Sequence, residues 1–286
     1  MKLLVYGAGV VGTQFAVRMH EAGHDVSLLA RGERLAALRR HGVRLAEGES
    51  PVVRQVPVPV VETPAGDYDL ITVFVRAHQV AAILEPLATL HGDVLFLLNW
   101  AAGAAPLAAA LGRDRVLLGF ATGGGTMAGD VVRYRAPSLL TRAYPVPIGE
   151  PDGRATPRLD RIARAFRTAG FPARLEPRIN ARLRTHAAFA VPLGQAAHAA
   201  GGPAALAADP AAVRDMLHHM RRNLAALPAP PVPRAFDALR TLPDGLLVPV
   251  LRRFLRGTTA AHSGLADSSL TATAEYEVLA EQLRAR

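Results

Sequence analysis

The segment Gly7-Ala8-Gly9-Val10-Val11-Gly12 decides how the first half of this chain folds. It directly follows a short apolar run, Lys2–Tyr6, which is typical of a buried parallel strand. After the turn, apolar residues recur at helical spacing until Gly23, a residue type that commonly ends a helix. A second apolar run follows at 25–30. The order of strand, glycine-rich turn, helix and strand predicts the first part of a dinucleotide-binding unit.

The alternation of strands and helices continues along the chain. Apolar runs at 69–75, 93–99 and 115–120 alternate with helical patterns at 79–90 and 104–111. Shorter runs at 131–134 and 146–149 are expected near an edge of the sheet, followed by a helix at 158–169 and a strand at 171–176. Only helical patterns follow, at 181–190, 211–227, 234–242, 246–255 and 272–284. The sequence therefore predicts an α/β protein with an N-terminal Rossmann-type doubly wound parallel sheet (1–177) and an all-helical C-terminal domain (178–286).

Composition excludes several classes of function. The chain has 286 residues and no cysteine, which rules out disulfides, thiolate nucleophiles and cysteine-based zinc sites. Its ten histidines lack the spacing of metal ligands, so no metal site is expected. The net charge is +9, but the arginines are dispersed, so no nucleic-acid partner is expected. No apolar run could span a membrane and no signal-peptide cleavage site follows the first strand, so we expect a cytoplasmic protein with no membrane partner.

Each glycine of the first turn has a distinct physical role in a dinucleotide site. Gly7 permits the tight turn, Gly9 lets the backbone approach a pyrophosphate, and Gly12 lets the helix pack closely on the strand. Ala8, Val10 and Val11 complete a turn whose amides lie at the positive end of the helix dipole. We therefore expect residues 7–12 to bind the phosphates. The alternative is that the glycines only shape the turn.

The residue at the end of the second strand indicates which dinucleotide binds. An NAD enzyme would place Asp or Glu there, about 20 residues past the glycine turn, to bind the ribose 2′-hydroxyl. This chain has Arg31, whose planar guanidinium suits a phosphate. We therefore predict NADP(H) as the cofactor, with Arg31 at the 2′-phosphate and Arg34 as a second candidate cation. For Arg31 the alternative is a solvated loop arginine.

Through these motifs and several others, the chain resembles the ketopantoate reductase family along nearly its full length. The further matching stretches are Gly23-His24-Asp25-Val26, Phe74-Val75-Arg76-Ala77-His78-Gln79, Leu97-Leu98-Asn99, the region 119–129 and Val191-Pro192-Leu193. The resemblance implies NADPH-dependent reduction of a small 2-oxo acid, bound in a cleft between the two domains.

The chain departs from this family where the proton donor of the reaction is expected. Ketopantoate reductases carry a lysine in a Trp-x-Lys-x-x-x-Asn pattern, whereas the corresponding stretch here, 182–189, has neither lysine nor asparagine. Arg184 is no simple replacement, because a guanidinium with a pKa above ~12 does not readily release a proton. His186 is the predicted substitute acid, since an imidazole with a pKa of ~6.5 suits proton transfer. The alternative is a histidine packed on the face of the helix.

Five further residues are candidates for the site. Asn99 and Arg76 each follow a strand, at the edge where ligands bind in open α/β sheets. We expect Asn99 to contact the nicotinamide ribose and the substrate, and Arg76 to contact the cofactor or a carboxylate; a loop-capping asparagine and a surface arginine are the alternatives. Trp100 stands where the family has glycine, as a substrate wall, a lid or a core residue. Ser268 and Glu275 are substrate-site candidates by position only.

Three functions stay open, in this order of preference. The first is an NADPH-dependent reductase of a small carbonyl or imine substrate. The second is an enzyme that keeps the fold but catalyses a cyclisation or isomerisation without net hydride transfer. The third is a non-catalytic NADP(H)-binding protein. A small molecule is the expected partner, and the oligomeric state is open, with a homodimer as one candidate.

Overall fold

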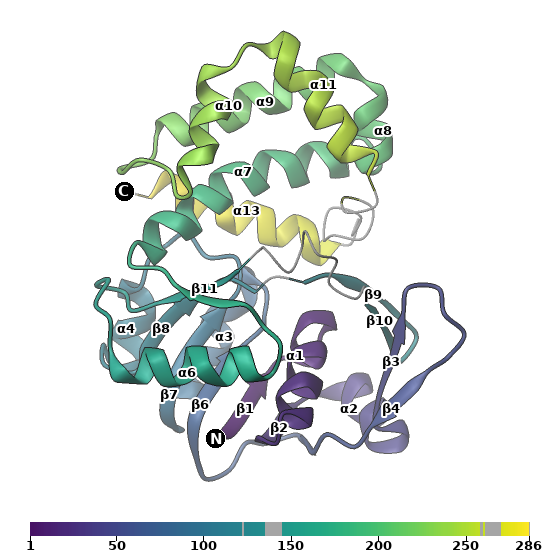
Figure 1. The fold of residues 1–286 in the computed structure, drawn as a ribbon, viewed down its shortest axis with the longest axis vertical. Coiled ribbons are helices and arrows are strands. Elements are labelled where there is room, and N and C mark those ends of the chain that lie inside the picture. Colours follow the sequence, from purple (N-terminus) through teal and green to yellow (C-terminus); the bar gives the residue numbers. More distant parts are fainter. Residues whose placement is uncertain (122, 135–144, 258–259, 261–269, 286) are drawn as a thin grey trace. The chain divides into compact units, whose positions relative to one another are not determined.

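The computed structural model describes residues 1–121, 123–134, 145–257, 260 and 270–285 (Figure 1). The chain forms two compact units. The first combines Met1–Leu98 with Ala104–Ile179, and the second combines Asn180–Arg286 with the short segment Asn99–Gly103. The sequence predicted a single boundary near residue 178, which leaves Asn99–Gly103 in the first domain. The structure instead groups this segment, which contains Asn99 and Trp100, with the second unit.

An eight-stranded sheet forms the centre of the first unit, in the order β12-β11-β8-β7-β6-β1-β2-β5. Neighbouring strands are parallel except for β11 and β8. The strands are β1 (Lys2–Tyr6), β2 (Asp25–Leu29), β5 (Val60–Val61), β6 (Asp67–Val73), β7 (His91–Leu97), β8 (Val116–Gly119), β11 (Val146–Gly149) and β12 (Ala173–Leu175). The chain goes from β1 to β2 and then returns to β6 on the other side of β1. The topological switch point, where open α/β sheets bind ligands, is therefore at β1.

Helices link these strands and bury both faces of the sheet. They are α1 (Val10–Glu21), α3 (Val80–Ala88), α4 (Ala105–Leu111) and α6 (Pro157–Thr168), with a 3-10 turn at Ala77–Gln79. The rings of Phe15 in α1 and Phe166 in α6 meet edge-on with centroids 5.0 Å apart, and both belong to one buried cluster with Leu3 and Val5 of β1. α3 and α4 pack against each other. This packing fixes the end of β1 and the turn that follows it. The predicted doubly wound sheet is confirmed.

A second sheet of four strands, in the order β4-β3-β10-β9, was not apparent from sequence patterns. Its strands are β3 (Val43–Glu47), β4 (Arg54–Val56), β9 (Gly125–Ala128) and β10 (Val131–Tyr134), and helix α2 (Gly32–His41) precedes it. The expectation that 131–134 lies near an edge of the main sheet is therefore wrong, and 146–149 lies second from that edge. Strands this short carry little periodic signal, and the run 131–134 does not by itself indicate which sheet it joins, since its partners β3 and β9 are set by the tertiary structure.

From Asn180 on, the regular elements in the described part of the second unit are all helices, as predicted. It contains α7 (Ile179–Ala199), α8 (Pro203–Ala208), α9 (Pro210–Ala225), α10 (Asp237–Thr241), α11 (Asp244–Leu255) and α13 (Leu270–Arg284), with a 3-10 turn at Arg234–Phe236. Helix α7 is longer than the expected 181–190, because Pro192 lies inside it without ending it. Buried leucine, valine and methionine side chains from α7, α8, α9 and α11 form the core of this unit.

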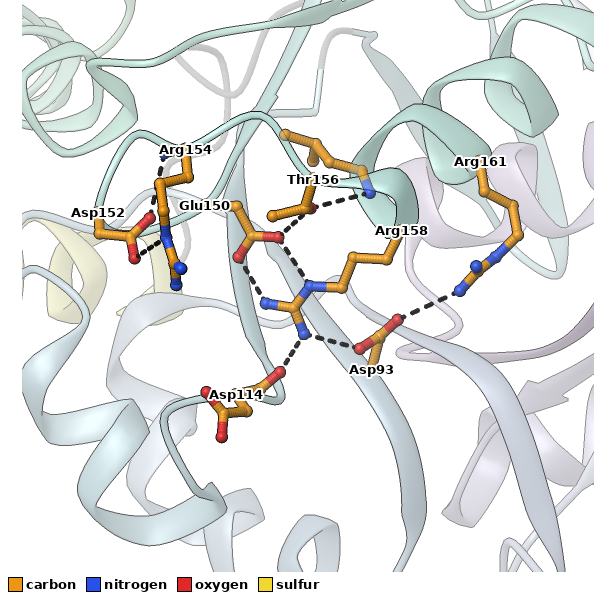
Figure 2. Close-up of polar contacts among 9 residues, drawn as sticks. Asp93, Asp114, Glu150, Asp152, Arg154, Thr156, Arg158 and Arg161 are labelled. Atoms are coloured by element: carbon orange, nitrogen blue, oxygen red, sulfur yellow. Dashed lines mark hydrogen bonds and ion pairs between the residues drawn. The ribbon is translucent and has the colours of Figure 1, made fainter.

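A cluster of ion pairs holds α6 against the sheet of the first unit (Figure 2). Arg158 of α6 donates to both carboxylate oxygens of Glu150, at 2.7 and 2.5 Å, and to Asp93 of β7 at 2.8 Å. The Glu150 side chain is only 5% exposed. Burial raises the pKa of Glu150, but hydrogen bonds from Arg158 and Thr156 outweigh it and hold the pKa below its ordinary value. The cluster therefore ties β7, the end of β11 and α6 together through charged groups.

Candidate functional site

The glycine turn lies between β1 and α1, at the carboxyl edge of the sheet. Gly7 has a φ of 117°, and a Cβ atom there would lie 2.7 Å from the carbonyl oxygen of Phe74. A Cβ atom at Gly12 would lie 2.1 Å from the carbonyl oxygen of Gly7. Both positions require glycine, because the neighbouring atom is backbone and cannot move aside. A Cβ atom at Gly9 would meet nothing within 4 Å, so the space in front of Gly9 is open.

Two side chains fix the orientation of the peptide group between Ala8 and Gly9. The Ala8 carbonyl oxygen accepts hydrogen bonds from Arg34 Nε and Thr13 Oγ1, both at 3.1 Å. In a planar trans peptide the N–H points away from the carbonyl oxygen, so the Gly9 N–H is directed away from these two side chains. Arg34 also donates to the backbone oxygen of Asp130 at 2.9 Å. Arg34 thus holds the turn, and it is not free to serve as the second phosphate-binding cation considered above.

The first turn of α1 is suited to an anion. Gly9 is the N-cap residue, no side chain caps the helix, and no acidic residue lies in the first turn. The first amides of a helix have no partner within it and form the positive end of its dipole. Together with the open space at Gly9, these amides fit the pyrophosphate of a dinucleotide.

Arg31 lies between β2 and α2 with an exposed side chain. Its Nη2 donates a hydrogen bond to the Tyr6 hydroxyl at 2.9 Å, and its guanidinium carbon lies 5.8 Å from the centre of the Tyr6 ring. Tyr6 is the last residue of β1 and is 3% exposed. Arg31 also lines an open hollow of about 360 Å³, with residues 62–64 and residues at the end of α3. We call this space the Arg31 hollow.

Arg76 follows β6 and begins the 3-10 turn. Its backbone N–H donates to the Gln79 Oε1 at 3.0 Å, which fixes the path of the chain as it leaves the sheet. The side chain of Arg76 is half-buried. Its contact with the cofactor or a carboxylate stays a prediction.

The segment Asn99–Gly103 brings two predicted site residues together within the second unit. Asn99 Nδ2 donates to Glu275 Oε1 at 3.3 Å, and Glu275 of α13 is 9% exposed. The Asn99 Oδ1 atom is buried and has no hydrogen-bond partner among the described residues. Trp100 is 7% exposed, and its indole N–H donates to the Gly103 carbonyl at 2.6 Å. Trp100 is therefore packed into its own loop, which favours the core interpretation over a lid.

Arg184 holds the same segment. Its Nη1 donates to the Ala101 carbonyl at 2.9 Å, and its Nη2 donates to the carbonyls of Leu283 and Ala285 at 3.2 and 3.3 Å. The Ala101 N–H in turn donates to Gln282 Oε1 at 2.8 Å. The guanidinium is thus engaged in structural hydrogen bonds, in agreement with its exclusion as a proton donor.

His186 lies on α7 with part of its surface exposed. Burial by the surrounding protein, and then the positive charge of Arg182, lower the pKa of His186 to about 4. The imidazole is therefore neutral at about pH 7, whereas a general acid must carry the proton it delivers. A neutral imidazole can still polarise a carbonyl by donating a hydrogen bond. The catalytic role of His186 stays a prediction. Its environment favours a neutral hydrogen-bond donor over a charged general acid.

The remaining expectations concern residues and partners away from these groups. Ser268 lies outside the described residues. In the described ranges, no group of three or more candidate ligand side chains could hold a metal ion. No helix there has both the length and the apolar character needed to cross a membrane.

Sequence reasoning missed Tyr6 and Thr13 as supports of the cofactor residues. The signal for Tyr6 is strand register, because Tyr6 pairs with Leu29 and Arg31 follows two residues later on the same face. Thr13 gives no comparable signal, because a threonine inside a helix is ordinary and its bond to Ala8 depends on the fold.

Comparisons with known proteins agree with this geometry. Residues 3–141 match the family model described as ketopantoate reductase PanE/ApbA. A stretch of 94 residues is 32% identical to the 2-dehydropantoate 2-reductase of Mesorhizobium japonicum and covers 32% of this chain. The solved 2-dehydropantoate 2-reductase of Geobacter metallireducens has a TM-score of 0.71 at 19% identity and covers 99% of both chains. A D-mandelate dehydrogenase solved with NADH and anilino(oxo)acetate has a TM-score of 0.74 at 15% identity and covers 99% of this chain and 98% of its own.

These matches differ in how much of each protein they cover and in what they show. The stretch matched in the Mesorhizobium protein spans only 29% of that protein's length. The solved structures share the fold at low identity, whereas the family match includes the glycine turn, Arg31, Arg76 and Asn99. Taken together, these findings show that residues 3–141 are similar to the ketopantoate reductase family model and that the chain shares the fold of solved 2-dehydropantoate 2-reductases; the relatives named here are oxidoreductases.

Proposed function

We propose that this chain is an NADPH-dependent reductase of a small carbonyl substrate, such as a 2-oxo acid, or of an imine. One observation carries the proposal: an open glycine turn occurs together with Arg31, a cation at the position where NAD enzymes place an acid. The D-mandelate dehydrogenase of the same fold was solved with NADH. That relative supports hydride transfer, and the choice of NADP rests on Arg31.

The cofactor would be held by this chain's backbone and one guanidinium. The amides of residues 9–12 would bind the pyrophosphate, and Arg31 would bind the 2′-phosphate. When bound, the cofactor supplies a hydride to the carbonyl or imine carbon. The phosphate turn needs little rearrangement, because Arg34 and Thr13 already direct the Gly9 N–H away from their own side chains, and the space in front of Gly9 is open.

Asn99 is the strongest candidate for positioning a ligand in the second unit. Leaving a buried polar atom unsatisfied costs about 1–3 kcal/mol, and Asn99 Oδ1 is such an atom among the described residues. A ligand hydroxyl that donates to Oδ1 would recover this energy. Glu275 would fix the amide for that purpose, because it accepts the hydrogen bond from Nδ2.

The substrate oxygen must gain a proton as its carbon gains a hydride. His186 is neutral at about pH 7, so it would stabilise the developing charge on that oxygen through an N–H hydrogen bond. Solvent would then supply the net proton. This division of roles differs from the use of a charged lysine as general acid, which the chain lacks in this stretch.

The experiment is a turnover screen with purified protein. NADPH consumption is followed by absorbance with a panel of 2-oxo acids and imines, and the product is identified by mass spectrometry. We expect at least one panel member to be reduced with one NADPH consumed per product. Tight NADPH binding with no reduction of any member would contradict the proposal.

A second candidate function is a non-redox reaction, cyclisation or isomerisation, in the same fold. It is favoured because neither candidate donor in the stretch 182–189 is suited to deliver a proton: His186 is neutral, and Arg184 is bound to backbone carbonyls. Product that forms without net NADPH consumption in the same screen would support it. Tight binding with no product of either kind would support a non-catalytic NADP(H)-binding protein.

A further inference from the structure

We propose that Tyr6 positions Arg31 for the 2′-phosphate and thereby contributes to the preference for NADPH over NADH. The inference rests on the proposed function and adds a residue to it. Tyr6 would act through Arg31 and would not itself contact the cofactor, so it is a positioning residue.

Two contacts orient the guanidinium on Tyr6. The Arg31 Nη2 donates to the Tyr6 hydroxyl at 2.9 Å, and the guanidinium carbon lies 5.8 Å from the ring centre, within the range of a cation–π interaction. Arginine has five N–H donors, and this contact uses one on Nη2. The other donors remain for a planar, bidentate contact with phosphate oxygens.

The fold makes Tyr6 a rigid support. Tyr6 is 3% exposed at the end of β1 and pairs with Leu29 of β2 on one side and Val73 of β6 on the other. Arg31 has an extended backbone, with φ −135° and ψ 163°, so its side chain returns to the face that Leu29 and Tyr6 share. A free arginine loses rotamer entropy when it binds, and an arginine held beforehand loses less.

The acidic residue that lines the Arg31 hollow does not neutralise Arg31. Glu62 lines the Arg31 hollow, but its carboxylate pairs with Arg39 at 3.3 Å. In the part of the chain that the structure describes, no ion pair joins Arg31 to a carboxylate. The charge of Arg31 is thus available to an anionic ligand.

The test compares NADPH and NADH affinities in Tyr6→Phe, which keeps the ring and removes the hydroxyl. We expect NADPH binding to weaken about fivefold, the equilibrium value of one typical hydrogen bond, with NADH binding unchanged. Tyr68→Phe is the matched control, because Tyr68 is another buried tyrosine beside a cation, Lys2, at the opposite end of the neighbouring strand. It should change neither affinity.

A double-mutant cycle separates positioning from a structural effect. In an Arg31→Ala background, Tyr6→Phe should no longer change NADPH affinity, because the partner is gone. An equal loss of NADPH and NADH binding in Tyr6→Phe, no loss at all, or tighter NADPH binding would each overturn the inference. If the wild-type protein itself does not prefer NADPH, the proposed cofactor fails instead, and that result is visible before any variant is made.

Discussion

Replacing Arg158 by methionine should destabilise the first unit through one buried carboxylate. Arg158 donates to both oxygens of Glu150 and to Asp93, and the side chains are 20%, 5% and 17% exposed, respectively (Figure 2). Breaking a buried ion pair on one side costs about 3–5 kcal/mol, because the remaining charge loses its partner. Since Arg158 is partly exposed, we expect the lower end, about 3 kcal/mol.

The assay is urea unfolding, with midpoints converted through the denaturant slope. The cost should shrink as pH falls toward about 4, because Glu150 in the variant can then be protonated. The double variant Glu150→Gln/Arg158→Met should be more stable than Arg158→Met alone, since no lone carboxylate stays buried. Arg154→Ala is the control: its pair with Asp152 is exposed, and its midpoint should not move. A double variant less stable than the single one would refute this reasoning.

Two further predictions concern the cofactor turn and His186. Gly9→Val should change stability by less than about 0.5 kcal/mol, because its side chain enters open space, yet abolish NADPH binding by filling the phosphate position. Gly12→Ala should instead destabilise the fold, because its Cβ would lie 2.1 Å from a backbone oxygen; thermal melts and binding titrations of both variants distinguish the two effects. Between pH 6.5 and about 4, the unfolded chain binds a proton at His186 that the folded chain does not, so stability should fall by about 3 kcal/mol over this range. His186→Gln should flatten this part of the pH–stability curve, and an unchanged slope would show that the pKa of His186 is not lowered.

The parts of the site that depend on local backbone could be predicted from the sequence. Gly12 is required by a close contact with the Gly7 carbonyl within the motif itself, and Gly7 is required by its φ of 117° at the turn, in addition to its contact with the distant Phe74. The position of Arg31 could be predicted because it follows the end of β2, about 20 residues past the glycine turn. In these cases the spacing of residues along the chain determines the geometry, so the sequence pattern was sufficient to predict it.

Features that depend on contacts between distant residues could not be predicted in this way. Asn99–Gly103 joins the second unit through Arg184 and Gln282, which are far away in sequence. The lowered pKa of His186 depends on what surrounds the ring. Arg34 looks like a phosphate cation in the sequence, but its guanidinium binds the Ala8 carbonyl. In each case the residue type indicated which chemistry was possible, and the tertiary contacts determined which role the side chain has.

The most direct measurement is the affinity of wild-type protein and Arg31→Ala for NADPH and NADH by isothermal titration calorimetry. We expect the wild-type protein to prefer NADPH, and Arg31→Ala to lose about 10- to 100-fold in NADPH affinity while NADH affinity stays the same, as befits a charged hydrogen bond to one phosphate. Equal affinity of the wild-type protein for both dinucleotides, or an equal loss of both in the variant, would contradict the assignment of Arg31 to the 2′-phosphate.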